Sequence, residues 1–237
     1  MPSVRELKGR KFVIAHRGAS AYYPENTLKA VRAALEMGAD VVEVDVRVTS
    51  DGYPVVIHDE TVDRTTNGTG AVSEMTLEEI RSLDAGEGEK VPLLSEVVEE
   101  VAGKAVLAVE LKVREAVRLA LDVVRGAGTL DATVFISFDA ESLRLVKKLE
   151  PRALTGLIYM KPPGAILEAK EIGAFAVLPY YRLATEKAVK FAKRLGLVVV
   201  AWVVDDPDLA IELWKRGVDG IATNKPDVIL HARDRLR

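Results

Sequence analysis

The sequence predicts an α/β protein, a (β/α)8 TIM barrel with a small insertion after the second strand. Three observations carry this prediction. Short apolar runs rich in β-branched residues alternate with helical segments, which implies parallel strands covered by helices. A joint recurs in which a helix ends at a glycine and a β-rich run follows, at Gly38, Gly173, Gly196 and Gly217. The 237-residue chain has about the length that eight such units need.

The predicted strands are the runs 12–16, 40–48, 105–111, 133–137, 154–159, 175–179, 197–203 and 219–223. The run 54–58 is either an extra strand or an extension of the sheet. The following segment has turn chemistry around Asn67-Gly68 and one short helix near 77–83, so we expect an insertion at approximately 59–90, near the mouth of the active site. No linker divides the chain, and we expect one domain over 1–237. A doubly wound open sheet is the alternative.

Composition narrows the class of protein. Hydrophobic residues make up 49% of the chain, enough for one core, and the net charge of −3 gives no reason to expect nucleic acid as a partner. Without cysteine, neither disulfides nor thiolate metal sites can form. The longest apolar stretch, 195–204, is too short to cross a bilayer. We expect a cytoplasmic protein with no transmembrane segment and make no prediction of its oligomeric state.

Two acidic residues share one face of the second predicted strand. In the run 41–48, valines alternate with Glu43, Asp45 and Arg47. The valine face would pack on helices, and the two acids would point into the barrel about 6.6 Å apart at their backbones, given ~3.3 Å per residue. Burying two carboxylates is costly unless they pair with cations, share a proton or hold a metal ion.

A third acid repeats the pattern on the next strand. Glu110 and Lys112 lie on the face opposite the leucines and valine of the run 107–111. Three inward carboxylates on two strands suit a hard divalent cation such as Mg²⁺, Ca²⁺ or Mn²⁺. The alternative is a structural ion-pair network that includes Arg47 and Lys112, and alternation alone does not choose between the two.

Two of the three histidines end apolar strands. His16 closes the run 12–16, and His58 follows the apolar run 54–57. Barrel enzymes place catalytic groups at this end of their strands, and histidine exchanges protons near neutral pH. A single histidine there is more often structural, whereas two at matching positions favour catalysis. The third, His231, is expected to be exposed in a polar C-terminal tail.

Four other residues near strand ends have competing interpretations. Arg17 and Lys112 are candidate phosphate ligands or charge balance for the acids. Trp202 is more often a core residue than a substrate platform, and Asn26 is expected to cap the helix that follows it. P-loop, dinucleotide-binding and Gly-x-Ser-x-Gly motifs are absent from the sequence, so nucleotide-dependent and serine-hydrolase functions have no support.

Ordered motifs extend over essentially the whole chain and are densest from 16 to 70. They are His16-Arg17-Gly18, Glu25-Asn26-Thr27, Glu43-Val44-Asp45, Asp51-Gly52-Tyr53-Pro54-Val55, His58-Asp59, Asp63-Arg64-Thr65-Thr66, Leu83-Asp84-Ala85-Gly86, Glu110-Leu111-Lys112, Ser137-Phe138-Asp139 and Gly217-Val218-Asp219-Gly220. In number, order and spacing they resemble the glycerophosphodiester phosphodiesterase family. That resemblance implies a TIM barrel with an insertion after the second strand.

The resemblance also implies a cation and a proton-transfer pair. Glu43, Asp45 and Glu110 would bind one divalent cation, Mg²⁺ ahead of Ca²⁺ or Mn²⁺. His16 and His58 would be the general acid and base, in an order that stays open. The expected reaction of this hydrolase is cleavage of a small glycerophosphodiester to a glycerol phosphate and an alcohol, within lipid and glycerol metabolism. Attack by a glycerol hydroxyl, through a cyclic phosphate, and direct attack by water are both compatible with it.

For three further residues the resemblance implies contact with substrate. Arg17 and Lys112 would lie near the phosphate, and Trp202 would line the glycerol side. Two alternatives stand beside this function. One is a phospholipase that acts on lysophospholipids with the same catalytic residues. The other is a binding or structural barrel without turnover, against which the joint presence of three acids and two histidines argues.

Two positions depart from the family pattern. Family members often follow the tryptophan with Thr-Val-Asn, whereas Trp202 is followed by Val203-Val204-Asp205. They often show Thr-Asp-x-Pro after the last strand, whereas this chain has Thr223-Asn224-Lys225-Pro226. Both positions lie at the upper rim of the predicted barrel, so we expect them to affect substrate preference more than chemistry.

Overall fold

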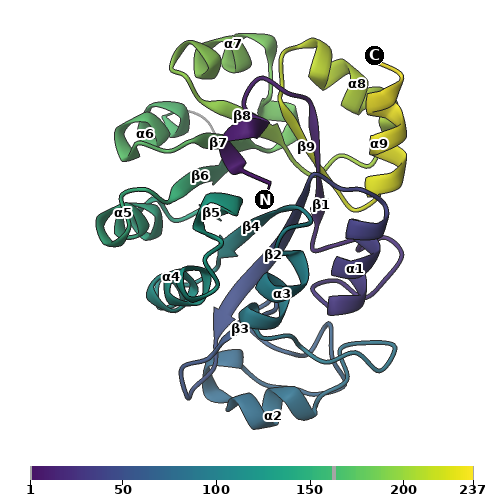
Figure 1. Cartoon of the computed structure of the whole chain (residues 1–237), viewed down its shortest axis with the longest axis vertical. Helices are drawn as coiled ribbons and strands as arrows, with labels where there is room; N and C mark the ends of the chain where they lie inside the picture. Colours follow the sequence, from purple (N-terminus) through teal and green to yellow (C-terminus); the bar gives the residue numbers. More distant parts are fainter. Residues whose placement is uncertain (1, 162–163, 237) are drawn as a thin grey trace.

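A closed barrel of eight parallel strands forms the centre of the computed structural model, which describes residues 2–161 and 164–236. Helices surround the strands on the outside (Figure 1). The first strand pairs with the last and also with the second, so the sheet closes on itself. The TIM barrel predicted from the sequence is therefore confirmed, and the open doubly wound sheet is excluded.

The barrel strands are β1 (Phe12–His16), β2 (Val41–Val48), β4 (Val106–Leu111), β5 (Thr133–Ser137), β6 (Leu154–Tyr159), β7 (Ala176–Pro179), β8 (Val198–Ala201) and β9 (Gly220–Thr223). The surrounding helices are α1 (Leu28–Glu36), α3 (Leu94–Val101), α4 (Ala116–Gly126), α5 (Ala140–Leu149), α6 (Ala165–Ile172), α7 (Glu186–Arg194), α8 (Pro207–Lys215) and α9 (Pro226–Asp234). The four glycines of the recurring joint all have positive φ angles, 85°, 73°, 82° and 101° in chain order. That backbone region favours glycine and ends a helix sharply.

Alternation along the strands divides the core into two layers. On β2, Val42, Val44 and Val46 face outward and pack with the helices, as predicted. The inward side chains of the other strands form a separate cluster inside the barrel, including Ile136 and Val200. This division follows from the pleat of a strand, which sends successive side chains to opposite faces.

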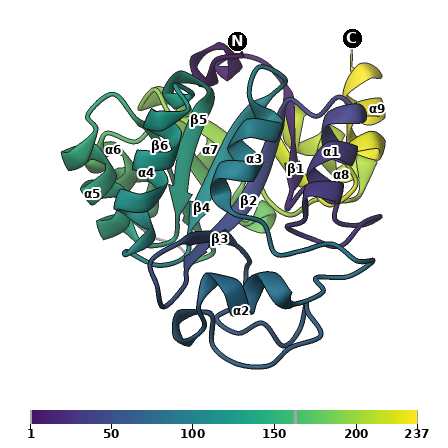
Figure 2. The ribbon, with the colours of Figure 1, turned by 60° about the horizontal axis from the view of Figure 1, so that its bottom comes forward.

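A short 3-10 helix, η1 (Val4–Leu7), closes the N-terminal end of the barrel. Val4 and Leu7 are buried against the interior cluster that includes Phe12. Figure 1 shows η1 lying across the centre of the barrel, and Figure 2 shows it at the end opposite the insertion. The C-terminal ends of the strands are therefore the end open to ligands.

The insertion begins with a strand that reverses direction. β3 (Pro54–Val56) pairs antiparallel with the end of β2, so the run predicted near here is an extra strand. Beyond it lie η2 (Val72–Glu74) and α2 (Leu77–Ser82), which projects below the barrel (Figure 2). Apolar side chains such as Ile80 give this region a small core of its own. The insertion thus extends the barrel past the C-terminal end of β2.

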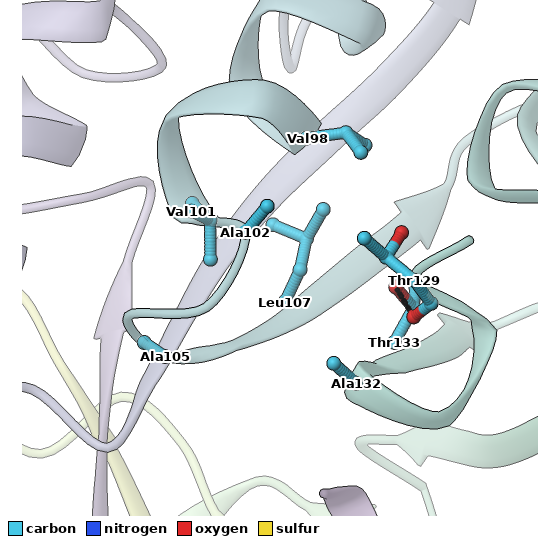
Figure 3. Close-up of a pocket in the computed structure, with 8 residues that line it drawn as sticks. All are labelled: Val98, Val101, Ala102, Ala105, Leu107, Thr129, Ala132 and Thr133. Carbon is cyan, nitrogen blue, oxygen red and sulfur yellow. Dashed lines mark hydrogen bonds between the residues drawn. The ribbon is translucent and has the colours of Figure 1, made fainter. Parts of the chain in front are cut away.

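A small cavity lies away from this end of the barrel, between α3, the start of β4 and the turn before β5 (Figure 3). Its volume is about 10 Å³, room for one water at most. The hydroxyls of Thr129 and Thr133 in its wall already donate to backbone carbonyls. It is a packing gap between helix and strand, and offers no free polar group to a ligand.

None of the helices within 2–161 and 164–236 has the length and apolar character needed to cross a membrane. The cytoplasmic location and the one-domain organisation stay predictions of the sequence.

Candidate active site

Three carboxylates meet inside the barrel near the C-terminal ends of β2 and β4. Glu43 and Asp45 lie on β2, and Glu110 lies on β4, directly opposite Asp45 in the strand register. One oxygen of each of the three lies within 4.8 Å of the others, and all three residues are buried. The convergence predicted from strand alternation is therefore present in the fold.

Two cationic side chains contact the acids. Arg17 Nε lies 3.1 Å from Asp45 Oδ2, close enough for an ion pair but without the alignment of a hydrogen bond. Lys112 Nζ donates to Glu110 Oε1 at 2.7 Å and lies 3.7 Å from Asp45 Oδ1. Two cations face three carboxyl groups, so these cations alone cannot balance three ionised carboxylates.

The acids are not fully satisfied by these contacts. Glu43 Oε1 and Asp45 Oδ1 are buried with no hydrogen-bond partner. Burial, together with the charges of Asp45 and Glu110, holds the pKa of Glu43 well above its usual range. Burial and the charge of Asp45 also raise the pKa of Glu110. Crowded carboxylates with free lone pairs fit a divalent cation, which prefers oxygen ligands.

Only one of the two cations expected in a structural ion-pair network pairs with the acids. Lys112 pairs with the acids, but the guanidinium of Arg47 donates from Nε to the carbonyl of His58 at 2.8 Å. Arg47 therefore positions the backbone next to a histidine, and the acidic cluster lacks the third cation that charge balance would require.

His16 stands at the end of β1, beside the acidic cluster. Its Nδ1 lies 2.8 Å from Asn224 Oδ1, and burial followed by the charge of Arg17 lowers the pKa of its imidazole. The backbone then turns through left-handed conformations at Arg17 (φ 57°) and Gly18 (φ 77°). A Cβ at Gly18 would lie 2.5 Å from the backbone of Ala30, so only glycine fits.

His58 follows β3 and approaches the pocket from the insertion side. Its Nδ1 lies 2.6 Å from Asp59 Oδ1, and Arg64 donates to both oxygens of Asp59. The hydrogen bonds from Arg64 and then from His58 lower the pKa of the Asp59 carboxyl. His58 is therefore oriented by a carboxylate that an arginine holds in place.

Glu25 connects the two histidine segments. It accepts hydrogen bonds from Arg17 at 2.8 Å and from both terminal nitrogens of Arg64. Burial opposes its ionisation, but the hydrogen bonds from Arg64 and the charge of Arg17 prevail and lower the pKa of Glu25 to about 2. One charged network thus joins β1, the insertion and the acidic cluster.

A cavity of about 270 Å³ opens between these groups and an apolar wall. The charged side is lined by His16, Arg17, Glu43, His58, Glu110 and Lys112. The apolar side is lined by Ile14, Ile136, Phe138, Ile158, Met160, Leu178, Trp202 and Ala222. A pocket of this size and mixed lining is suited to a small ligand with one charged and one apolar end.

Trp202 forms part of the apolar wall just beyond β8. Its indole Nε1 donates to the carbonyl of Leu178 at 2.7 Å, and its ring meets Phe138 edge to face at 5.6 Å. Trp202 is packed like a core residue and also lines the cavity, so it has features of both interpretations, a core residue and a substrate platform. The predicted strand 197–203 ends earlier, at Ala201.

The structure brings the eight predicted site residues to one place. Seven line the cavity, and Asp45, which is fully buried, lies behind them in contact with Arg17 and Lys112. His231 is exposed as expected, and it lies on α9.

The expectation that Asn26 caps the helix after it is wrong. Thr27 is the N-cap of α1, accepting from the backbone of Ala30. Asn26 is buried with φ 58°, donates from Nδ2 to Asp45 at 2.9 Å and accepts from the backbone of Asp45. Asparagine tolerates this left-handed backbone better than most residues. Its amide therefore positions a carboxylate of the site.

Four further polar residues of the site were not among the predicted site residues: Glu25, Arg64, Asp205 and Asn224. The available signal for Glu25 and Arg64 was that each belongs to a motif that follows closely after one of the histidine motifs. The signal for the last two was the departure from the family pattern, which was interpreted as a substrate effect. Asn224 contacts His16 directly, so this departure lies next to the candidate chemistry.

A TIM barrel with charged and titratable side chains gathered at the C-terminal ends of its strands is the architecture of an enzyme. Residues 16–228 match the model of the glycerophosphoryl diester phosphodiesterase family. The chain therefore belongs to this family and is a phosphoric diester hydrolase.

Individual relatives agree over nearly the whole chain. A glycerophosphodiester phosphodiesterase of Caldanaerobacter subterraneus is 38% identical, with 94% of this chain and 97% of the relative covered. A phosphodiesterase of Oleispira antarctica, solved with the product sn-glycerol-3-phosphate, superposes with a TM-score of 0.91 at 30% identity, covering 95% and 97%. A glycerophosphodiester phosphodiesterase of Agrobacterium tumefaciens superposes with a TM-score of 0.84 at 32% identity, covering 93% and 99%.

Proposed function

We propose that the protein hydrolyses glycerophosphodiesters to a glycerol phosphate and an alcohol, with one divalent cation and with His16 and His58 as the proton-transfer pair. The observation that carries this proposal is the meeting of three carboxylates and two histidines around one cavity of about 270 Å³. The Oleispira antarctica relative, whose structure contains sn-glycerol-3-phosphate, supports the substrate class.

Glu43, Asp45 and Glu110 would hold the cation, which we propose to be Mg²⁺, with Ca²⁺ or Mn²⁺ as alternatives. Their free buried oxygens and the raised pKa of Glu43 support this assignment. When bound, such a cation neutralises phosphate charge and acidifies a hydroxyl that it contacts.

The two imidazoles present corresponding nitrogens to the substrate. Nδ1 of His16 is engaged by Asn224 and Nδ1 of His58 by Asp59, so Nε2 is the nitrogen left to each ring for chemistry. One histidine removes the proton from the attacking group, a glycerol hydroxyl or a water molecule, and the other gives a proton to the oxygen of the leaving alcohol. If the glycerol hydroxyl attacks, water then opens the cyclic phosphate to give the glycerol phosphate. Two histidines with fixed orientation are what such an exchange requires.

Arg17 and Lys112 would bind the phosphate. Both line the cavity while holding the acids, Arg17 through Asp45 and Lys112 through Glu110. A phosphate group entering the cavity therefore meets two cations already fixed in position. The planar fork of arginine and the compact charge of lysine both suit phosphate oxygens.

Replacing each histidine by alanine tests the proton-transfer pair. H16A and H58A should each lower kcat by roughly 10²–10⁴, the usual contribution of a general acid or base. The matched control is H231A, which should leave kcat unchanged because His231 is exposed on α9.

Removing the metal tests the cation. Excess chelator should abolish turnover, and added Mg²⁺, Mn²⁺ or Ca²⁺ should restore it. Full-rate turnover by H58A, or undiminished activity in chelator, would refute the proposal.

A second candidate function is cleavage of lysophospholipids at the same site. The observation that favours it is the apolar side of the cavity, where Phe138 is 45% and Met160 is 55% exposed. Exposed apolar side chains at a pocket mouth can contact an acyl chain. Steady-state kinetics with glycerophosphocholine and lysophosphatidylcholine separate the two functions, since only the second substrate carries that chain.

A further inference from the structure

Asp205 lies behind Asn224, the residue that contacts His16, and has no part in the chemistry proposed above. Asn224 follows β9, and Asp205 lies in the segment between β8 and α8. Asn224 Oδ1 lies 2.8 Å from His16 Nδ1, and Asn224 Nδ2 donates to Asp205 Oδ2 at 2.9 Å. The carboxylate, the amide and the imidazole therefore form one line of contacts that ends at the cavity.

The carboxylate fixes which way the amide points. Asp205 Oδ1 accepts from Thr223 Oγ1 at 2.8 Å and from the backbone nitrogen of Asn224 at 2.7 Å. Because an ionised carboxylate only accepts hydrogen bonds, the group of Asn224 that faces Asp205 must be its NH₂. The amide oxygen is then turned toward His16, and Ser20 Oγ lies 3.0 Å from the same oxygen.

The amide oxygen in turn fixes the proton of the imidazole. An amide oxygen accepts but cannot donate, so Nδ1 of His16 has to carry the hydrogen of their 2.8 Å contact. In the neutral ring the other nitrogen, Nε2, then holds a lone pair. The tautomer of His16 is thus set by Asp205, although the two residues share no direct hydrogen bond.

We propose that Asp205 and Asn224 are positioning residues that hold His16 in the Nδ1–H tautomer and present Nε2 to the cavity as a proton acceptor. The catalytic role of His16 in this proposal rests on the proposed function. The tautomer of His16 does not, because it is a property of the enzyme without substrate.

The order of the two residues gives the proposal a specific test. Exchanging both residues keeps one carboxylate and one amide in contact, so the line of hydrogen bonds to His16 can form in either order. Exchanging only Asp205 leaves two amides facing each other, and exchanging only Asn224 leaves two carboxylates. In the wild type the contact between Asn224 Nδ2 and Asp205 Oδ2 is 2.9 Å long.

The experiment compares D205N, N224D and the double variant D205N/N224D. We expect kcat of each single variant to fall roughly 10- to 100-fold, as for other residues that orient a catalytic or ligating histidine, with KM within about twofold. In D205N the Asn224 amide is free to rotate and turn its NH₂ toward His16. The double variant should recover kcat to within about threefold of the wild type. D206N, which removes the charge of the neighbouring aspartate but keeps a side-chain oxygen to cap α8, is the matched control and should leave kcat unchanged.

Nitrogen-15 NMR of histidine-labelled enzyme without substrate gives the second measurement. We expect Nδ1–H for His16 in the wild type and the double variant, and Nε2–H or a mixture in D205N. N224A removes the amide without adding charge, and serves if a single exchange prevents folding; its His16 signals should average between tautomers.

Wild-type kcat with an unchanged tautomer in D205N would overturn the proposal. So would a loss in D205N that leaves the tautomer unchanged and is not recovered in the double variant, because that pattern marks a purely structural role. If the tautomer shifts as expected while H16A retains full activity, the positioning stands and the proposed function fails.

Discussion

The two walls of the cavity are built differently. The wall from β1, β2 and β4 carries carboxylates, cations and a histidine, tied together by hydrogen bonds that run from Asn26 to Arg64. The wall from β5 to β8 carries apolar side chains, of which Trp202 packs edge to face against Phe138. Both walls come from inward positions of the strands and from residues that closely follow a strand, so the difference between the walls lies in residue type.

The contrast separates two tasks. Charged side chains in a low-dielectric pocket act strongly on a phosphate and on protons, but only while their number and geometry are kept. Apolar side chains contribute contact area, which changes how well a ligand is held more than how fast it reacts. Substitutions on the first wall should therefore change kcat, and substitutions on the second should change KM.

The largest effect is expected from Glu43 on the charged wall. E43Q should lower kcat/KM by roughly 10³-fold or more, because one of three cation ligands is lost. Without metal, the same variant should be more stable than the wild type by about 1 kcal/mol, since a neutral amide relieves crowding among buried charges. Steady-state kinetics and urea unfolding in chelator at pH 8 measure both effects.

The matched control is E186Q on α7, where Glu186 pairs with Lys190 in solvent. It should change neither activity nor stability measurably. If E43Q retained the metal affinity of the wild type by calorimetry, Glu43 would not be a ligand and the charged wall would lose its proposed role.

A smaller effect is expected from Trp202 on the apolar wall. W202A should raise KM by roughly 10- to 30-fold through lost contact area, while kcat stays within about threefold. W202F keeps an aromatic ring against Phe138 but loses the hydrogen bond to Leu178, and should stay near wild-type KM. A fall in kcat of W202A at unchanged KM would contradict the division between the walls.

The smallest effect is expected from Glu25, and it is an effect on stability. Its pKa in the folded protein is lowered to about 2, so its contribution is present above the unfolded value near 4.5 and is lost as the pH falls toward 2. Since its side chain is 21% exposed, we expect E25Q to lose only about 1–2 kcal/mol at pH 7. Urea unfolding from pH 7 to 3 should show the wild type and E25Q converging below pH 4.5. A gap independent of pH would show that Glu25 acts through packing.

Local patterns were sufficient for the strands and the acidic cluster. A period of two places Glu43 and Asp45 on one face and the valines on the other, wherever β2 lies in the fold. The end of β8 was harder to predict, because Trp202 continues the apolar run but leaves the strand and forms only an isolated bridge with Tyr180. A hydrophobic residue at a strand end does not reveal whether it faces a sheet or a ligand.

Polar side chains far from their partners in sequence were assigned poorly. Asn26 was expected to cap a helix because asparagine often does so, yet its amide binds the buried Asp45, 19 residues away. Asn224 lies at the rim, as expected, but its contact with His16 across 208 residues was not foreseen. Neither contact has a local signal, because each depends on strands that meet only when the barrel closes.

The sequence by itself determined the alternation of strands and helices, the inward acids, the two histidines at strand ends and the family. These features depend on residue spacing along one strand or on the order of motifs, both of which are properties of the chain. Tertiary contacts decided the rest. Closure of β1 against β9 brings Asn224 and Asp205 to His16 and so sets its tautomer. Packing of the insertion near the segment after β1 forms the network that joins Glu25 to both histidine segments. Hydrogen bonds act over about 3 Å, so their partners are fixed only once the fold has brought distant strands together.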